Sequence, residues 1–194
     1  MNPEAQGRNS LREIRIHGRG GQGSLVLAQF IAIAALEEGK FSQAFPFLGA
    51  GGERRGKAIQ AFARIDDRFI RLRSRVHEPD YVIVQDPTIL SEMNVLEGLK
   101  ERGTVLINTE KSLSPPEREG FIRWVEVPAS KIALKVLGRP LMNAALLGAF
   151  SVATQEISLP SIEKAIQRRF PGEVGLQNVE IARKAYQYCQ KEGL

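Results

Sequence analysis

Residues 13–38, with the sequence EIRIHGRGGQGSLVLAQFIAIAALEE, decide the fold of this chain. Residues 13–17 alternate charged and apolar side chains, as a short β-strand does. Residues 24–38 are rich in Ala and Leu and predict a helix that ends at Gly39. Between them, Gly18, Gly20 and Gly23 form the pattern G-x-G-x-x-G. A strand, a glycine turn and a helix in this order predict the first unit of an α/β domain.

The rest of the chain extends this α/β pattern. We expect a hairpin in which residues 57–65 pair with residues 69–73, because both segments alternate. The other expected strands are 41–48, 81–85, 104–108 and 122–127. The expected helices are 91–101, 129–137, 141–154, 159–170 (capped by Ser158) and 177–190. The prediction is one Rossmann-like α/β domain at 13–194 after a flexible arm at 1–12, with a mostly parallel sheet, a hairpin and a helical C-terminal layer.

The composition excludes several classes of protein. The chain has 194 residues, of which 43% are hydrophobic and 25% charged, so it has enough apolar surface to fold. Cys189 is the single cysteine, which excludes a disulfide framework within the chain and leaves a small core residue. No apolar run reaches the ~20 residues that span a bilayer. Residues 1–10 lack the apolar region of a signal peptide, so we expect a cytoplasmic protein without a membrane anchor.

The positive charge of the chain is concentrated in one segment. The net charge is +5, and residues 53–75 contain eight basic and three acidic residues, so the whole excess lies there. Seven of the eight are arginines, whose planar guanidinium matches phosphate and carboxylate groups. The segment is expected to face an anionic ligand, a nucleic acid or an acidic protein, unless it is only a solvated charged surface.

The glycine turn is a candidate anion site. Glycines let the backbone approach a ligand closely, and the helix that follows presents free N–H groups to an anion. The alternative is a tight turn that needs glycine for packing alone. A dinucleotide site would also have an acidic residue ~20 positions further on, to hold the ribose. Residues 41–45 have none, so an NAD-dependent dehydrogenase is disfavoured.

Other chemistry is sparse. His17 and His77 are 60 positions apart with no cysteine near either, so the sequence predicts no zinc site. His17 is expected to be a hydrogen-bonded residue at the end of a strand rather than a ligand. No nucleophile motif, Walker lysine or pair of carboxylates is present, so we assign no catalytic residue and no metal ligand.

Short motifs follow one another along nearly the whole chain, from residue 14 to residue 186. They are residues 17–23, 44–47, 53–56, 71–74, 78–88, 108–109, 143 with 147–149, and 178. In this order they resemble the gamma subunit of pyruvate:ferredoxin oxidoreductase and its 2-oxoacid relatives. The ordered series is far more specific than the glycine turn alone.

The resemblance implies one part of a larger enzyme. Such an enzyme oxidatively decarboxylates a 2-oxo acid with coenzyme A to acyl-CoA, CO2 and reduced ferredoxin or another acceptor. Thiamine diphosphate would lie between alpha and beta subunits, and 4Fe-4S clusters would lie in partners that include a ferredoxin-like delta subunit. This chain would hold neither group and would help to bind coenzyme A and to close the active site. The residues implied for coenzyme A are Gly18, Arg19, Gly20, Gly21, Gln22, Gly23, Arg54 and Arg55.

Two features leave alternatives open. Residues 48–52 lengthen the link between the aromatic segment and residues 53–56 relative to the pyruvate pattern, so a sibling for branched-chain or aromatic 2-oxo acids such as phenylglyoxylate is equally compatible. The glycine turn alone would also suit a stand-alone nucleotide-binding protein. A nucleic-acid partner is disfavoured because residues 57–75 lack interleaved aromatic residues for base stacking.

Subunit contacts are expected on two apolar segments. These are the aromatic residues Phe41, Phe45 and Phe47 and the apolar helix around Leu146. Both offer more apolar surface than one small domain readily hides.

Overall fold

The computed structural model describes residues 10–47, 55–115 and 120–194. Six strands form one sheet in the order β2-β3-β1-β4-β5-β6, and three of the five neighbouring pairs are parallel. The strands are β1 (Arg12–Arg19), β2 (Phe41–Phe47), β3 (Ala58–Asp66), β4 (Tyr81–Val84), β5 (Thr104–Asn108) and β6 (Arg123–Val127). The helices are α1 (Ser24–Glu37), η1 (Pro87–Ser91), α2 (Ala129–Leu137), α3 (Asn143–Thr154), α4 (Leu159–Arg169) and α5 (Glu173–Lys191).

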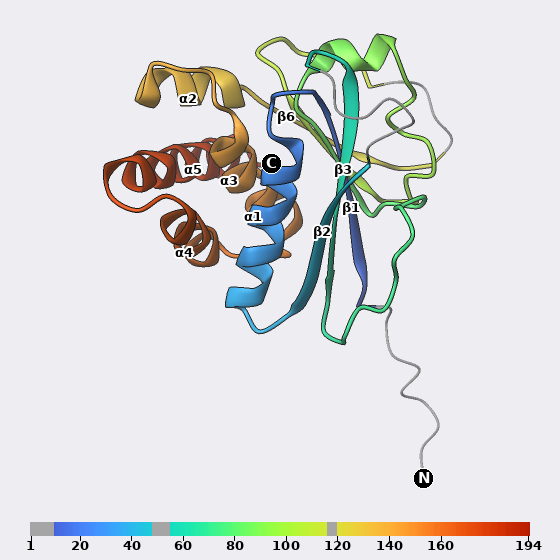
Figure 1. Cartoon of the computed structure of the whole chain (residues 1–194). Helices are drawn as coiled ribbons and strands as arrows, with labels where there is room; N and C mark the ends of the chain where they lie inside the picture. The colour runs from blue at the N-terminus through green and yellow to red at the C-terminus, as the bar shows by residue number, and fades with distance from the viewer. Residues whose placement is uncertain (1–9, 48–54, 116–119) are drawn as a thin grey trace.

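The architecture confirms the predicted fold class. Helices α1 to α5 gather on one side of the sheet, and the helical C-terminal layer packs there against α1 (Figure 1). β5 and α2 have the predicted bounds, and Ser158 caps α4 by accepting a hydrogen bond from the Ser161 N–H. β1 begins at Arg12, inside the segment predicted to be a flexible arm. Residues 1–9 of that arm lie outside the described residues.

The sheet separates two apolar clusters. In β4, Val82, Ile83 and Val84 are all fully buried, as the continuous apolar run predicted. Ile83 belongs to the large cluster under the helices, whereas Val82 and Val84 belong to a smaller cluster on the opposite face. This division follows from the two-residue period of a strand, which points successive side chains to opposite faces.

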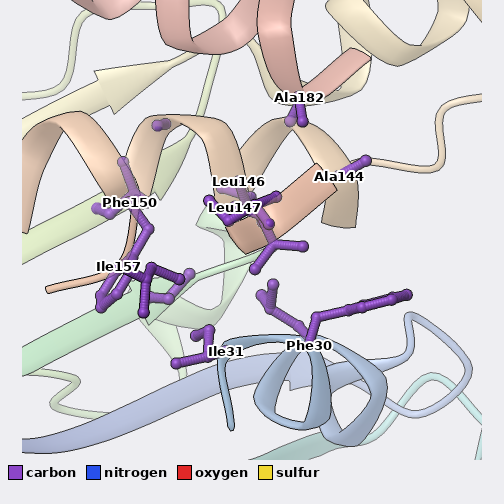
Figure 2. Close-up of a cluster of buried hydrophobic side chains, with 14 of the residues drawn as sticks. Phe30, Ile31, Ala144, Leu146, Leu147, Phe150, Ile157 and Ala182 are labelled. Atoms are coloured by element: carbon purple, nitrogen blue, oxygen red, sulfur yellow. The ribbon is translucent and has the colours of Figure 1, made fainter. Parts of the chain in front are cut away.

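The large cluster joins α1, α3 and α5 to the sheet. Figure 2 shows Phe30 and Ile31 of α1 on the same side of α3 as Leu146 and Leu147, with Ala182 of α5 on the other. Leu146 is fully buried within the chain. The expectation that the helix around Leu146 offers a surface to other subunits is therefore wrong, because α1 and α5 already cover it.

Helices α3 and α5 approach closely at Gly148. A Cβ on Gly148 would overlap the carbonyl oxygen of Ala182 and lie 3.1 Å from the backbone nitrogen of Tyr186. Further along α5, Cys189 is fully buried, as predicted, and burial raises the pKa of its thiol to about 11. The two helices are thus packed backbone to backbone, with no room for a larger residue at position 148.

Two predicted elements are wrong. The hairpin of the fold consists of β2 and β3, not of residues 57–65 and 69–73, since β3 pairs antiparallel with both β2 and β1. Residues 69–73 form no strand and cross the face of the sheet opposite the helices, where Gln43 donates to the Ile70 carbonyl and Arg64 to the Ser74 carbonyl. The predicted helix at 91–101 is absent as well, and the link from β4 to β5 is the 3-10 helix η1 followed by turns.

Candidate functional site

The glycine loop, defined here as residues 18–23, lies at the carboxyl edge of the parallel strands. β1, β4 and β5 are neighbours with the same direction, so the residues that follow them meet at one edge. α1 begins there directly after the loop. In open α/β sheets, ligands bind at this edge. The glycine loop therefore lies at the edge that its sequence pattern predicted, and its binding of an anion stays a prediction.

The backbone of the loop needs its glycines. Gly21 and Gly23 have φ angles of 95° and 75°, a left-handed conformation that other residues rarely adopt. A Cβ on Gly18 would overlap the side chains of Gln85 and Ser24. Gly23 precedes α1 without a side-chain cap, and the first turn of α1 has no acidic residue. Among the described residues, no N-cap side chain accepts from the first N–H groups of α1, which makes these groups candidate donors to an anion.

Arg19 anchors the loop to the segment that follows β4. Its guanidinium lies 3.2 Å from Asp86 Oδ2, 2.5 Å from Glu92 Oε1 and 2.5 Å from Thr88 Oγ1, and it donates to the carbonyl of Gly56. These acidic partners already neutralise its charge within the chain. Arg19 therefore orients the loop, while its predicted contact with coenzyme A stays a prediction.

A network of buried polar side chains holds the glycine loop through hydrogen bonds. Gln85 is fully buried, donates from Nε2 to the carbonyl of Gln22 (3.3 Å) and to Asn143 Oδ1 (2.6 Å), and accepts from Ser24 Oγ (2.5 Å). Asn143, at the start of α3, donates to the same Gln22 carbonyl at 3.2 Å. Asn108, at the end of β5, donates to the Gln85 carbonyl at 2.9 Å. Elements from four parts of the chain thus hold one loop.

The residue types in this network gave no functional signal by themselves. In the sequence, Gln85, Asn108 and Asn143 stand out only as members of the motifs that resemble the gamma subunits. A single amide side chain is common in any sequence, and its role depends on residues about 60 positions away. The signal that identifies these three residues is their place at the ends of β4 and β5 and the start of α3.

Arg55 is the exposed arginine next to the loop. Residues 55–57 pair with the glycine loop. Gly20 forms an isolated β-bridge with Arg55, and the Gly20 N–H donates to the Lys57 carbonyl at 2.9 Å. Arg55 Cγ lies 3.8 Å from where a Cβ on Gly21 would be. Arg54, the other arginine predicted for the ligand, lies outside the described residues. The structure thus brings Arg55 and the glycine loop together.

His17 is a structural residue, as predicted. It lies inside β1, is 1% exposed, and accepts a hydrogen bond at Nε2 from Arg15 Nε at 3.0 Å. Its Nδ1 lies 3.3 Å from the sulfur of Met93. Burial, together with the charge of Arg15, lowers the pKa of His17 to about 3, so the imidazole is neutral in the folded protein at neutral pH.

Acid should destabilise the protein through His17. The unfolded chain takes up a proton on this residue below its ordinary pKa of 6.5, whereas the folded chain resists uptake down to about 3. Stability is therefore full above pH 6.5 and falls by up to about 1.4 kcal/mol per pH unit towards pH 3. Urea unfolding between pH 7 and pH 4 should show a smaller loss for His17→Gln than for the parent chain. Variant His77→Gln, at an exposed histidine, is the control, and equal slopes for the parent and His17→Gln would contradict the assignment.

None of the helices in the described part of the chain has the length and hydropathy of a membrane-spanning segment. Across residues 10–47, 55–115 and 120–194, no three His, Cys, Asp or Glu side chains are grouped to hold a metal ion.

Comparison with known proteins identifies the family. Residues 13–188 match the family described as pyruvate ferredoxin/flavodoxin oxidoreductase. The chain is 48% identical over 180 residues to pyruvate synthase subunit PorC of Methanocaldococcus jannaschii, covering 93% of this chain and 98% of that one. It is 46% identical over 178 residues to the common gamma subunit of the pyruvate/ketoisovalerate oxidoreductases of Pyrococcus furiosus, covering 90% and 95%.

A solved structure has the same fold. The crystal structure of the pyruvate oxidoreductase subunit PORC from Thermotoga maritima superposes with a TM-score of 0.77 at 38% identity, covering 92% of this chain and 96% of that one. The match spans almost all of both chains. The resemblance seen in the ordered motifs is thereby confirmed. The chain belongs to the pyruvate ferredoxin/flavodoxin oxidoreductase family, among its gamma-type subunits.

Proposed function

We propose that this chain is the gamma subunit of a 2-oxoacid oxidoreductase in which it helps to bind coenzyme A and to close the active site. The observation that carries the proposal is the arrangement of Arg55 beside a glycine loop whose helix N-terminus is uncapped. Coenzyme A presents phosphate groups, and both a guanidinium and free N–H groups at a helix start bind phosphate well. The enzyme would oxidatively decarboxylate a 2-oxo acid to an acyl-CoA and CO2.

The substrate we propose is pyruvate. Relatives at 45–48% identity are named as pyruvate synthase subunits or as subunits common to pyruvate and ketoisovalerate oxidoreductases. Such shared subunits favour a role for this chain in the coenzyme A step rather than in the choice of 2-oxo acid. Branched-chain acids and phenylglyoxylate are therefore the alternatives, to be compared with pyruvate in turnover assays of the assembled enzyme.

The partners we propose are the alpha, beta and ferredoxin-like delta subunits, with thiamine diphosphate and 4Fe-4S clusters held by them. Exposed apolar surface supports an assembly: Phe41, Phe47 and Phe69 are 43%, 38% and 71% exposed. On the helical side, buried and half-buried residues of α1 line a largely apolar cavity of about 320 Å³ together with Ala44 and Arg169. A helix that is apolar on all sides normally lies inside a protein or an assembly.

Replacing Arg55 with alanine tests the coenzyme A contact. One charge-assisted hydrogen bond contributes roughly 1.5–3 kcal/mol, and about 1.4 kcal/mol corresponds to a factor of ten. The Michaelis constant for coenzyme A should therefore rise about tenfold or more in the assembled enzyme. Decarboxylation of the 2-oxo acid before coenzyme A enters should change much less.

The matched control is Arg68→Ala. Arg68 is exposed in the same arginine-rich segment but follows the opposite end of β3. It should leave the Michaelis constant for coenzyme A unchanged. If Arg55→Ala behaved in the same way and the complex still assembled, Arg55 would be a subunit contact and the proposed coenzyme A role would be lost. Tightly held NAD in the purified chain would instead favour a stand-alone nucleotide-binding protein.

A further inference from the structure

A cationic cavity lies on the face of the sheet opposite the helices. Arg15 in β1 points to this face because it alternates with Ile14 and Ile16, which belong to the cluster under the helices. The segment between β3 and β4 crosses the same face and closes the cavity from outside. The cavity has a volume of about 80 Å³ and is lined by Arg15, Gln60, Arg75, Val76, His77 and Glu97.

Arg15 is a buried cation that forms no salt bridge with a described residue, although the Glu97 carboxylate interacts with it electrostatically at longer range. It is 5% exposed, donates from Nε to His17, and donates from Nη2 to the backbone carbonyls of Val95 and Glu97. Its other terminal nitrogen, Nη1, has no acceptor in the described part of the chain. Burial lowers the pKa of Arg15, so its charge costs free energy there. Buried charges in proteins are normally paired with an opposite charge.

Arg75 is held at the mouth of the cavity in a defined orientation. Its Nε donates to His77 Nε2 at 3.2 Å, and its guanidinium carbon lies 5.4 Å from the centre of the Phe47 ring. These contacts leave both terminal nitrogens of Arg75 without an acceptor among the residues that the structure describes. The Gln60 amide is likewise available, while the exposed Glu97 contributes the single carboxylate of the lining. Two guanidinium groups against one carboxylate leave a net positive charge.

We propose that this cavity binds a small tetrahedral oxyanion, of the phosphate or sulfate class, between Arg15 and Arg75. The volume of about 80 Å³ exceeds the ~30 Å³ share of one water molecule but is too small for a nucleotide. Donors from β1, β3 and the crossing segment line the cavity, and an ion with four oxygens can accept from all three, whereas a carboxylate offers two oxygens. None of the lining residues belongs to the polar network of the glycine loop, so the inference goes beyond the proposed function.

Titration of inorganic phosphate into the full chain by calorimetry, at constant ionic strength, tests the site. Arg75→Gln should weaken binding about tenfold or more, because it removes charge-assisted hydrogen bonds. Since Arg75 is exposed, this variant should fold. The matched control is Arg71→Gln, an exposed arginine of the same crossing segment that does not line the cavity. It makes the same change in net charge and should keep the parent affinity.

A second pair of variants tests whether removing a negative charge from the cavity strengthens phosphate binding. Glu97→Gln removes the carboxylate that faces the anion and should tighten phosphate binding several-fold, whereas Glu101→Gln, at an exposed position outside the cavity, should not. Equal losses in Arg75→Gln and Arg71→Gln would overturn the proposal, as would an unchanged affinity in Glu97→Gln or the absence of saturable binding. Acetate that binds as tightly as phosphate would overturn the tetrahedral assignment.

Discussion

Replacing Gly148 with alanine is expected to destabilise the protein by about 3 kcal/mol, near the upper end of the cost of overpacking. The new Cβ would overlap the Ala182 carbonyl oxygen, and backbone atoms of α5 cannot rotate away as a side chain could. The helices α3 and α5 would have to move apart, and the cluster between them and the sheet would lose contacts.

Whether Gly148→Ala lowers or raises the stability of the protein distinguishes close packing from a helix without a close neighbour. In a helix without a close neighbour, alanine is more favourable than glycine by about 1 kcal/mol. Urea unfolding followed by circular dichroism measures the difference between the parent and the variant. A variant that is more stable than the parent would show that α3 and α5 do not pack as closely as the structure has them.

Replacing Gln85 with leucine should have the second largest effect. Leucine has a similar size but leaves Ser24 Oγ, the Gln22 carbonyl and Asn143 Oδ1 without the partners that Gln85 provides. A buried polar group that loses its partner costs about 1–3 kcal/mol. The Gln22 carbonyl keeps its hydrogen bond from Asn143, and the loop can shift toward water, so we expect a loss of about 2 kcal/mol and a looser glycine loop.

Hydrogen exchange separates the two consequences of Gln85→Leu. The amides of Gln22 and Leu27, which donate to the carbonyls of Arg19 and Gly23, should exchange faster than in the parent chain, while those of β5 keep their protection. Gln190→Leu, at an exposed position of α5, is the matched control and should change neither stability nor exchange. Unchanged exchange at Gln22 and Leu27 in Gln85→Leu would mean that the network does not hold the loop.

Local patterns in the sequence were sufficient for most of the elements. The strand at residues 104–108 and the helix at residues 129–137 have the predicted bounds, because a short apolar run and a regular helical pattern each end at clear boundary residues. The strand, glycine turn and helix of residues 13–38 are confirmed as β1, the glycine loop and α1. In these segments the favoured local conformation and the tertiary packing agree.

Tertiary contacts decided the elements that the sequence predicted wrongly. Residues 69–73 alternate as a strand would, but β1 and β2 already occupy both edges of β3, so no edge remains for them. Residues 91–101 have helical composition, yet their carbonyls at Val95 and Glu97 accept hydrogen bonds from the buried Arg15, which fixes an irregular link instead. A partner that lies about 80 residues away cannot be found from a local pattern.

The features of the candidate site also fall into those that the sequence predicted and those that only the tertiary structure showed. By itself, the sequence determined that glycines join a strand to a helix at residues 18–23 and that the positive charge lies in residues 53–75. Only the tertiary structure showed that Arg19 is already paired with Asp86 and Glu92, whereas Arg55 lies beside Gly21. The physical reason is that a glycine turn depends on the φ angles of its own residues. The charge available to a ligand depends instead on which acidic groups the fold places within reach.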